Sequence, residues 1–333
     1  MSEETLARRI ERERAPWVST ATRDAIRHFA WGVGDDNPLW LDLDHAESSI
    51  WGSLVAPPCF AYAVDETTVA PDHDDHRRVY RSVDWRWYDI VRAGSELKAA
   101  ALLTTEDDED TVDDGFHQSG RLEFTIGGSV VATADSRCYR TTSPAQAIED
   151  RPEVRYTPGE LDEIEQTILA EERRGPSPRR WEDVQVGDEL DPLLKGPLSI
   201  MDVVAWCAGT QGVPDDASGA HQFSEGGLHA QTATGPQQVA WLAQLLTDWM
   251  GDDAFLHRLQ VDLVANPALG TTTALSGRVT GRSNEAGPAS VAVGVVAESQ
   301  DGEVTATGRG IILLPSLASG PVSLPLTAAS THA

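Results

Sequence analysis

The sequence contains little cysteine and no long apolar segment. Its three cysteines, Cys59, Cys138 and Cys207, are far apart and form no CxxC pair. This argues against a disulfide framework and a zinc site, and it indicates a reducing compartment. No apolar run approaches the ~20 residues of a membrane helix. The N-terminus, MSEETLARRIERERAPW, is charged where a signal peptide is apolar. We therefore expect a cytoplasmic protein that does not enter the membrane.

Basic residues are also few. Lysine and arginine together number 26 against 53 aspartates and glutamates, which gives a net charge of −27. A chain this acidic repels phosphate backbones, so nucleic acid is excluded as an expected partner. The hydrophobic fraction of 40% is globular, and 333 residues are enough for two domains with separate cores.

Two halves of the sequence repeat the same order of elements. Each half opens with a short helical segment (residues 22–34 and 199–209), in which Asp24 corresponds to Asp202 and Ala30 to Ala208. A polar loop follows each helix and leads to a second helix with an apolar face. The second helices are expected at 58–69 and 235–250, and the stripe of the latter, predicted to be core, is Val239, Leu242, Leu245, Leu246 and Trp249.

Alternating strand patterns joined at glycine-containing turns close each half. Segment 88–104 parallels 265–281, and segment 121–140 parallels 290–314. One helix followed by several long antiparallel strands predicts a sheet wrapped around that helix. Two such units could lay their sheets edge to edge, which predicts an α+β pseudo-dimer.

Proline-rich breaks divide the chain into four segments. Helical spacing in residues 159–174 predicts a helix between the halves. We expect an N-terminal unit at 1–143, a linker with a helix at 144–178, a C-terminal unit at 179–316 and a flexible tail at 317–333.

The loop of the first half carries a specific motif. It resembles the G-D-x-N-P-x-H-x-D loop of the MaoC-like dehydratases and (R)-specific enoyl-thioester hydratases, which have the hotdog fold. Gly34, Asp35, Asn37, Pro38 and Asp42 match, while Trp40 stands at the family's histidine position. The segment 56–58, Ala-Pro-Pro, replaces the family's A-H-G. The resemblance implies that the first half is non-catalytic, shapes the acyl pocket and completes the sheet.

The second half carries a degenerate form of the same motif. Asp216 and His221 have the family spacing, with Ser218-Gly219 in place of Asn-Pro. Ala233-Thr234-Gly235 replaces A-H-G, and residues 179–206 resemble the entry to a catalytic MaoC-like domain. The resemblance therefore implies a double hotdog protein whose catalytic unit is the C-terminal one.

The implied activity is a hydro-lyase that adds or removes water across the 2,3 bond of an acyl-CoA or acyl-carrier-protein thioester. Asp216 and His221 would form the acid–base pair, and the Gly235 N–H would bind the thioester oxygen. No metal or organic cofactor is required. A homodimer of the whole chain is compatible with the frequency of closed homo-oligomers.

Several alternatives stay open for individual residues. Asp215 competes with Asp216 as the acid. His229 is more simply a structural or pocket-lining residue than the base. For Asp35 and Asn37 we favour loop closure by side-chain hydrogen bonds, and Trp40 either lines a pocket or packs between the halves, as does Trp51.

Two charged clusters could have other roles. Arg77, Arg78, Arg81 and Arg86 could bind an anionic coenzyme A ester, or they could form a solvated basic turn. Residues 72–76, Asp-His-Asp-Asp-His, are better explained as an acidic loop than as a cation site.

Three other functions also fit the sequence. A specialised biosynthetic dehydratase, isomerase or cyclase would agree with the altered Ser218-Gly219 loop. A hotdog thioesterase and a non-catalytic acyl-binding subunit are the other two.

Overall fold

The computed structural model describes residues 12–13, 18–65, 77–107, 115–142, 154–210, 232–284 and 287–326. The helices are α1 (Arg23–Val33), α2 (Pro38–Leu41), α3 (Leu43–Ser48), α4 (Pro158–Leu169), α5 (Ile200–Thr210) and α7 (Gly235–Met250), with 3-10 helices η1 (Pro58–Ala63) and η3 (Trp181–Asp183). The strands are β1 (Arg12–Glu13), β2 (Arg77–Trp87), β3 (Leu97–Asp107), β4 (Phe116–Ile126), β5 (Ser129–Thr141), β6 (Leu193–Lys195), β7 (Phe255–Leu263), β8 (Thr273–Ser283), β9 (Ser290–Ser299) and β10 (Val304–Leu313).

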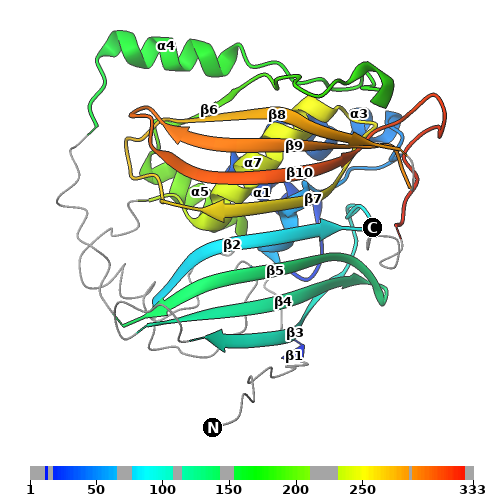
Figure 1. Cartoon of the computed structure of the whole chain (residues 1–333), viewed down its shortest axis with the longest axis horizontal. Helices are drawn as coiled ribbons and strands as arrows, with labels where there is room; N and C mark the ends of the chain where they lie inside the picture. The colour runs from blue at the N-terminus through cyan, green and yellow to red at the C-terminus, as the bar shows by residue number, and fades with distance from the viewer. Residues whose placement is uncertain are drawn as a thin grey trace.

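All the strands form one antiparallel sheet. Their order is β1-β3-β4-β5-β2-β7-β10-β9-β8-β6, so each half contributes one side of the sheet (Figure 1). The halves join through β2 and β7, with Asp84 opposite Gln260. At this joint the carboxylate of Asp84 accepts two hydrogen bonds from Arg258, at 2.7 and 2.8 Å. The predicted α+β architecture of two hotdog units joined edge to edge is confirmed.

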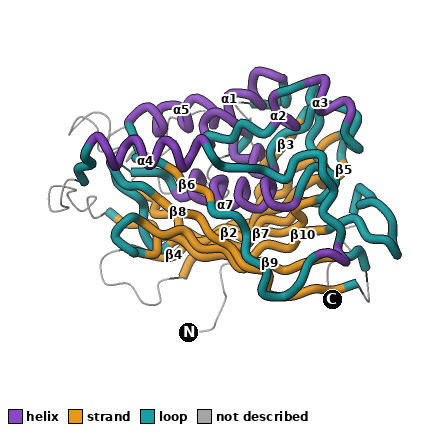
Figure 2. Tube along the Cα trace, turned by 90° about the horizontal axis from the view of Figure 1, so that it is seen from above, coloured by secondary structure: helices purple, strands orange, loops and turns teal. Residues whose placement is uncertain are grey.

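The helices α1, α5 and α7 lie together on one face of the sheet (Figure 2). The strands turn alternate side chains toward this layer, as in β9, where Val291, Val293 and Val295 are almost fully buried. All 16 residues of α7 are buried, including the predicted apolar stripe. This helix is therefore the centre of the core, as the pattern of its sequence indicates.

Helices α1 and α5 pack through reciprocal glycine contacts. A Cβ atom on Gly32 would lie 2.9 Å from the Ala205 carbonyl oxygen, and one on Gly209 would lie 2.7 Å from the His28 carbonyl oxygen. Such reciprocity is the mark of two-fold symmetry between the halves. In this symmetry Arg23, the first residue of α1, corresponds to Ile200, the first residue of α5. The predicted correspondence of Asp24 with Asp202 is therefore shifted by one residue.

The described part of the segment 58–69, where we expected a long central helix, is not α-helical, and residues 66–69 lie outside the described residues. Within the described residues this segment has only the short 3-10 helix η1, closed by bonds from Phe60 N to the Pro57 oxygen and from Val64 N to the Ala61 oxygen. Tyr62 of η1 packs edge-on against Trp85 of the sheet, with ring centroids 5.1 Å apart. Large aromatic side chains of η1 and the sheet therefore pack together at this position.

The tail is not free along its whole length. Val322, Leu324 and Leu326 pack against the core, and the Leu326 N–H donates to the Tyr88 oxygen at 2.7 Å. The expectation of a flexible tail from residue 317 is therefore wrong for residues 317–326, because apolar side chains dock there. The helix predicted between the halves is present as α4.

The three cysteines are free thiols. Across the described ranges, no helix combines the length and apolar character needed to cross a membrane. In that same part of the chain, no three histidine, cysteine or acidic side chains gather as they would around a metal ion.

The glycine contact between α1 and α5 predicts the effect of adding one methyl group. Gly209→Ala should lower the free energy of unfolding by about 1–3 kcal/mol, because its Cβ would overlap the backbone of α1. The matched control is Gly159→Ala in α4, where a Cβ meets no atom within 4 Å. This change should be neutral or stabilising by up to ~1 kcal/mol. Urea denaturation of both variants measures the difference, and equal stabilities would contradict the packing account.

Candidate functional site

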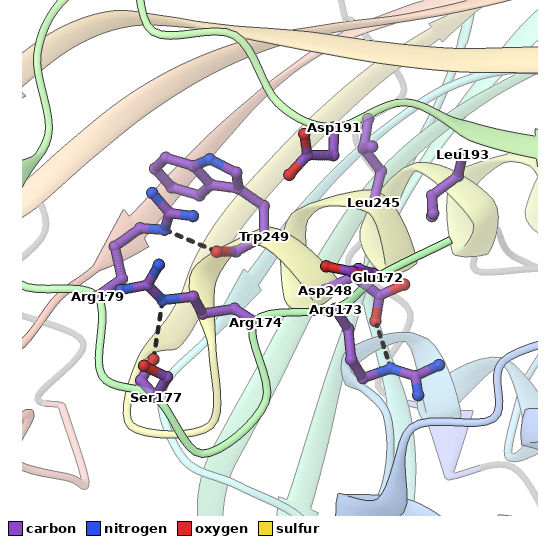
Figure 3. Close-up of a pocket in the computed structure, with 10 residues that line it drawn as sticks. All are labelled: Glu172, Arg173, Arg174, Ser177, Arg179, Asp191, Leu193, Leu245, Asp248 and Trp249. Atoms are coloured by element: carbon purple, nitrogen blue, oxygen red, sulfur yellow. Dashed lines mark hydrogen bonds and ion pairs between the residues drawn. The ribbon is translucent and has the colours of Figure 1, made fainter. Parts of the chain in front are cut away.

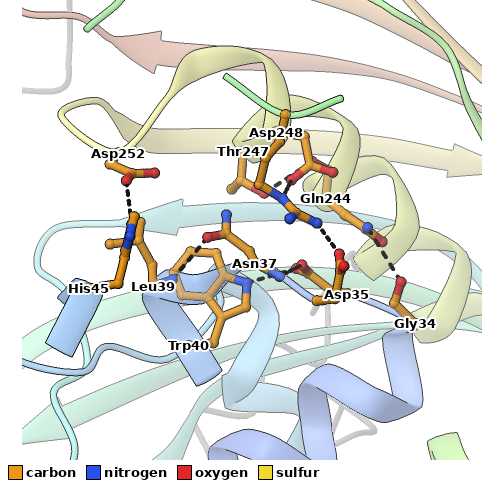
Figure 4. Close-up of polar contacts among 12 residues, drawn as sticks. Gly34, Asp35, Asn37, Leu39, Trp40, His45, Gln244, Thr247, Asp248 and Asp252 are labelled. Atoms are coloured by element: carbon orange, nitrogen blue, oxygen red, sulfur yellow. Dashed lines mark hydrogen bonds and ion pairs between the residues drawn. The ribbon is translucent and has the colours of Figure 1, made fainter. Parts of the chain in front are cut away.

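The motif loop of the first half is closed by its own side chains. One oxygen of Asp35 accepts from the Asn37 N–H at 3.0 Å, and the Asn37 side-chain oxygen accepts from the Leu39 N–H at 3.0 Å. The other oxygen of Asp35 accepts from the Trp40 indole N–H at 2.9 Å (Figure 4). All three motif residues are buried, at 3%, 2% and 4% exposure. The loop-closure interpretation of Asp35 and Asn37 agrees with these bonds.

Trp40 holds the aspartate that would be paired with histidine in the family motif. An indole N–H is only a donor and does not exchange protons at neutral pH, whereas an imidazole does. The Asp35–Trp40 pair therefore cannot act as an acid–base pair. Trp51 instead packs between the halves, because its indole N–H donates to the Asp252 oxygen at 2.8 Å.

A half-buried lysine links this loop to the second half. The Lys195 ammonium donates to the Gly34 oxygen at 2.9 Å, to the Val33 oxygen at 3.3 Å and to the Gln244 side-chain oxygen at 2.5 Å. Burial lowers the pKa of Lys195, and the nearby Asp35 opposes that change. Burial also raises the pKa of Asp35, against the hydrogen bonds that it accepts.

Asp248, near the end of α7, belongs to the same charged cluster. Burial, and next the charge of Asp35, raise the pKa of Asp248 to about 7, while Arg173 opposes the change. Arg173 donates to the Asp248 carboxylate at 3.3 Å and also pairs with Asp36 of the first half. The four charged groups therefore join both halves to the segment that follows α4.

Asp248 also lines a cavity of about 270 Å³ (Figure 3). Three arginines from the segment after α4 line it too. Besides Arg173, these are Arg174, which donates to the Ser177 backbone oxygen, and Arg179, which donates to the Trp249 backbone oxygen. A carboxyl group that titrates near neutrality beside a cavity has the properties of a general acid or base. However, Asp248 is thirteen residues beyond Gly235, or about 20 Å along the helix. It is therefore remote from the helix start that the family motif selects.

Sequence reasoning missed Lys195, Arg173 and Asp248. Each belongs to no motif, and the three lie far apart in the chain. The one available signal was the run of arginines at 173–180, in a chain that has few basic residues. Their convergence depends on how the linker crosses α7, which no local pattern reports.

The start of α7 lies against the sheet of the first half. Gly235 is buried, and the Thr234 hydroxyl accepts from the Gln237 N–H at 3.2 Å as the N-cap. A Cβ on Gly235 would lie 2.6 Å from Leu263 and 2.9 Å from Tyr80. The missing side chain therefore makes room for protein atoms on that side of the glycine. The Gly235 N–H, as the first of the helix, has no intrahelical acceptor.

Tyr80 begins a chain of polar contacts on the inner face of the first half. Its hydroxyl lies 3.2 Å from the Tyr62 hydroxyl and 3.1 Å from the Ser136 hydroxyl. Tyr62 in turn accepts from the Trp85 indole N–H at 2.9 Å. The helix start of one half thus meets a hydroxyl-lined wall of the other half.

Other predicted site residues lie outside the described residues. These are the proposed pair Asp216 and His221, the alternatives Asp215 and His229, and the acidic segment 72–76. The arginine cluster belongs to strand β2, so the alternative of a basic turn is wrong. Within β2, Arg86 pairs with Asp84 at 2.7 Å, while Arg81 is exposed.

Comparison with known proteins places the fold in a class. Residues 10–132 match the model of the FAS1-like dehydratase domain region. A solved structure named MaoC-like dehydratase superposes with a TM-score of 0.66 at 18% identity, over 92% of this chain and 98% of its own. Rv0216 of Mycobacterium tuberculosis, described as having a double hotdog fold, gives 0.61 at 11% identity, over 91% and 96%. The protein therefore has the double hotdog fold, and its N-terminal part is similar to a dehydratase domain region.

More specifically, the resemblance to the MaoC-like dehydratases is confirmed, with the FAS1-like dehydratase region in the N-terminal half. Among curated proteins, a UPF0336 protein of Streptomyces avermitilis is 28% identical over 88 residues, or 24% of this chain. The matched part is 59% of the length of that relative.

The raised pKa of Asp248 predicts a pH-dependent stability difference. In the unfolded chain an aspartate loses its proton near pH 4, whereas folded Asp248 keeps it to about 7. The folded state thus binds more protons in this window, so this group makes the protein less stable as pH rises from about 4 to 7. Asp248→Asn removes that loss. The unfolding free energy of the variant minus that of the wild type should rise through the window and then level off.

Chemical denaturation at several pH values measures this difference. Thr247→Val is the matched control, because it removes a buried hydroxyl of the same helix that donates to the Gln244 oxygen and does not titrate. Its difference from the wild type should be constant with pH. A constant difference for Asp248→Asn would contradict the assigned pKa.

Proposed function

We propose that the protein is a hydro-lyase that adds water to, or removes it from, the 2,3 bond of an acyl thioester. The thioester would be carried on coenzyme A or an acyl carrier protein. The observation that carries the proposal is the position of Gly235, where the buried central helix α7 begins against the opposite hotdog unit. The double hotdog fold and the match to a dehydratase region support it.

The proposed chemistry assigns one task to each group. Asp216 and His221 would activate water at C3 and exchange a proton at C2, since an imidazole titrates near neutral pH. The thioester oxygen becomes negative as the enolate forms. The Gly235 N–H and the positive end of the α7 dipole would stabilise it, whereas Pro236 lacks the N–H for this role.

The acid–base proposal predicts a loss of turnover without a loss of folding. Asp216→Asn and His221→Ala should each lower kcat by about 10²–10⁴-fold, with little change in melting temperature. The measurement is the loss of absorbance of the conjugated thioester with trans-2-enoyl-CoA substrates of several chain lengths. Asp215→Asn and His229→Ala are the matched controls and should keep most of the activity. Full activity in either main variant would exclude the pair, and a larger loss in a control would move the role to that residue.

A non-catalytic acyl-binding subunit is the second candidate. It is favoured by the loop of the first half, where the Asp35 carboxylate accepts a hydrogen bond from the Trp40 indole in place of a histidine. Binding of acyl thioesters without turnover of any enoyl or 3-hydroxyacyl thioester would establish it. Release of free thiol would instead show a thioesterase. We retain the cytoplasmic location and the homodimer as predictions.

A further inference from the structure

Two arginines face each other on the inner side of the first half's sheet. Arg78 of β2 is directly opposite Arg140 of β5, and Arg140 is 1% exposed. Directly opposite residues of neighbouring strands project to the same face of the sheet, so the two guanidiniums lie side by side on this face. Burial raises the pKa of the Cys138 thiol, and the charges of Arg140 and Arg78 oppose that rise, as expected if both lie close to the thiol.

The neighbouring row of side chains adds a buried donor that is not used. Gln118, fully buried, lies opposite Cys138, which in turn lies opposite Tyr80. The Gln118 side-chain oxygen accepts from the Arg140 guanidinium at 3.0 Å. Among the described residues, neither the Gln118 side-chain nitrogen nor the Arg78 Nε has a hydrogen-bond partner. An unused buried donor is costly, so such groups indicate a missing acceptor.

The location connects this arginine row to the proposed thioester site. Tyr80 contacts the position of a Gly235 Cβ, and Arg78 is two residues along the same strand, or about 7 Å. In the described part of the chain no carboxylate pairs with Arg78, although the protein has a net charge of −27. A guanidinium without an acid partner in so acidic a protein is poised for an external anion.

We propose that Arg78, Arg140 and Gln118 bind a carboxylate at the far end of the substrate's acyl chain, so that the substrates are thioesters of short dicarboxylic acids. The inference rests on the proposed function for the location of the thioester. Its chemistry is a carboxylate that accepts from two guanidiniums and one amide. The phosphates of coenzyme A carry similar oxygens, and the experiment separates these two sources.

The test measures binding and requires no turnover. Calorimetric titration compares glutaryl-CoA with pentanoyl-CoA, two saturated thioesters that differ in the terminal carboxylate. The wild type should bind glutaryl-CoA about tenfold more tightly or better, as expected for charge-assisted hydrogen bonds. Arg78→Gln should reduce the ratio to about one. Arg81→Gln, the same charge change at an exposed position of β2, should leave the ratio unchanged.

Gln118→Glu provides a variant that should fold better than the wild type. The new carboxylate would accept from Arg140 and replace the unused nitrogen by an acceptor. It should raise the melting temperature and abolish the preference for glutaryl-CoA. An unchanged preference in this variant or in Arg78→Gln would overturn the proposal.

N-acetylcysteamine thioesters distinguish the carboxylate from the phosphates, because they carry no phosphate. Preference for glutaryl- over pentanoyl-N-acetylcysteamine would support the acyl carboxylate. The other outcome is that Arg78→Gln weakens the binding of both coenzyme A thioesters equally and does not change the binding of either N-acetylcysteamine thioester. In that case the bound anion is a phosphate, and the proposed substrate class is wrong. Absence of hydratase turnover would contradict the proposed function and leave this binding preference intact.

Discussion

The pairing of β2 with β7 is the constraint on which the rest of the structure depends. Each half alone would expose a sheet edge and an apolar sheet face, both of which favour aggregation. Pairing removes the two edges and makes one face wide enough to bury every residue of α7. The Asp84–Arg258 ion pair lies at this joint, where a displaced register would separate the two groups. The start of α7 can meet Tyr80 only because this register is fixed.

The same joint brings charged groups into the interior. Lys195, Asp35, Asp248 and Arg173 are held where two halves and a linker meet, and mutual pairing offsets part of the cost of burial. Hydrogen bonds from Lys195 to the backbone of the motif loop fix that loop relative to α7. The loop of the first half that resembles the family motif is thus part of the interface between the halves, with the Trp40 indole as a donor inside the loop.

The fold was largely predictable from the sequence, whereas the site was predictable only in part. Alternating strands and the apolar stripe of α7 are local patterns, and the tandem order of elements indicated a pseudo-dimer. Strand β2 was taken for a basic cluster, because charged residues interrupt its alternation. Residues 58–63 were expected to begin an α-helix and instead form 3-10 turns, since Pro58 and an apolar run are compatible with both. Cross-strand neighbours such as Arg78 and Arg140 are 62 positions apart in the chain, so only the register of β2 and β5 brings them together.

The asymmetry between the halves has a functional consequence. A symmetric pair of hotdog units would present two helix starts to two equivalent walls. In this protein the first half has the short 3-10 helix η1, which ends at Ala63. The face of its sheet beside the start of α7 carries hydroxyl, amide and guanidinium groups. One half therefore contributes the helix dipole and the other contributes the lining. Most of these groups bond to one another, but among the described residues the Gln118 side-chain nitrogen and the Arg78 Nε have no acceptor. Because a buried donor without an acceptor is costly, these two donors are better explained by a ligand that carries oxygen atoms of its own than by packing alone.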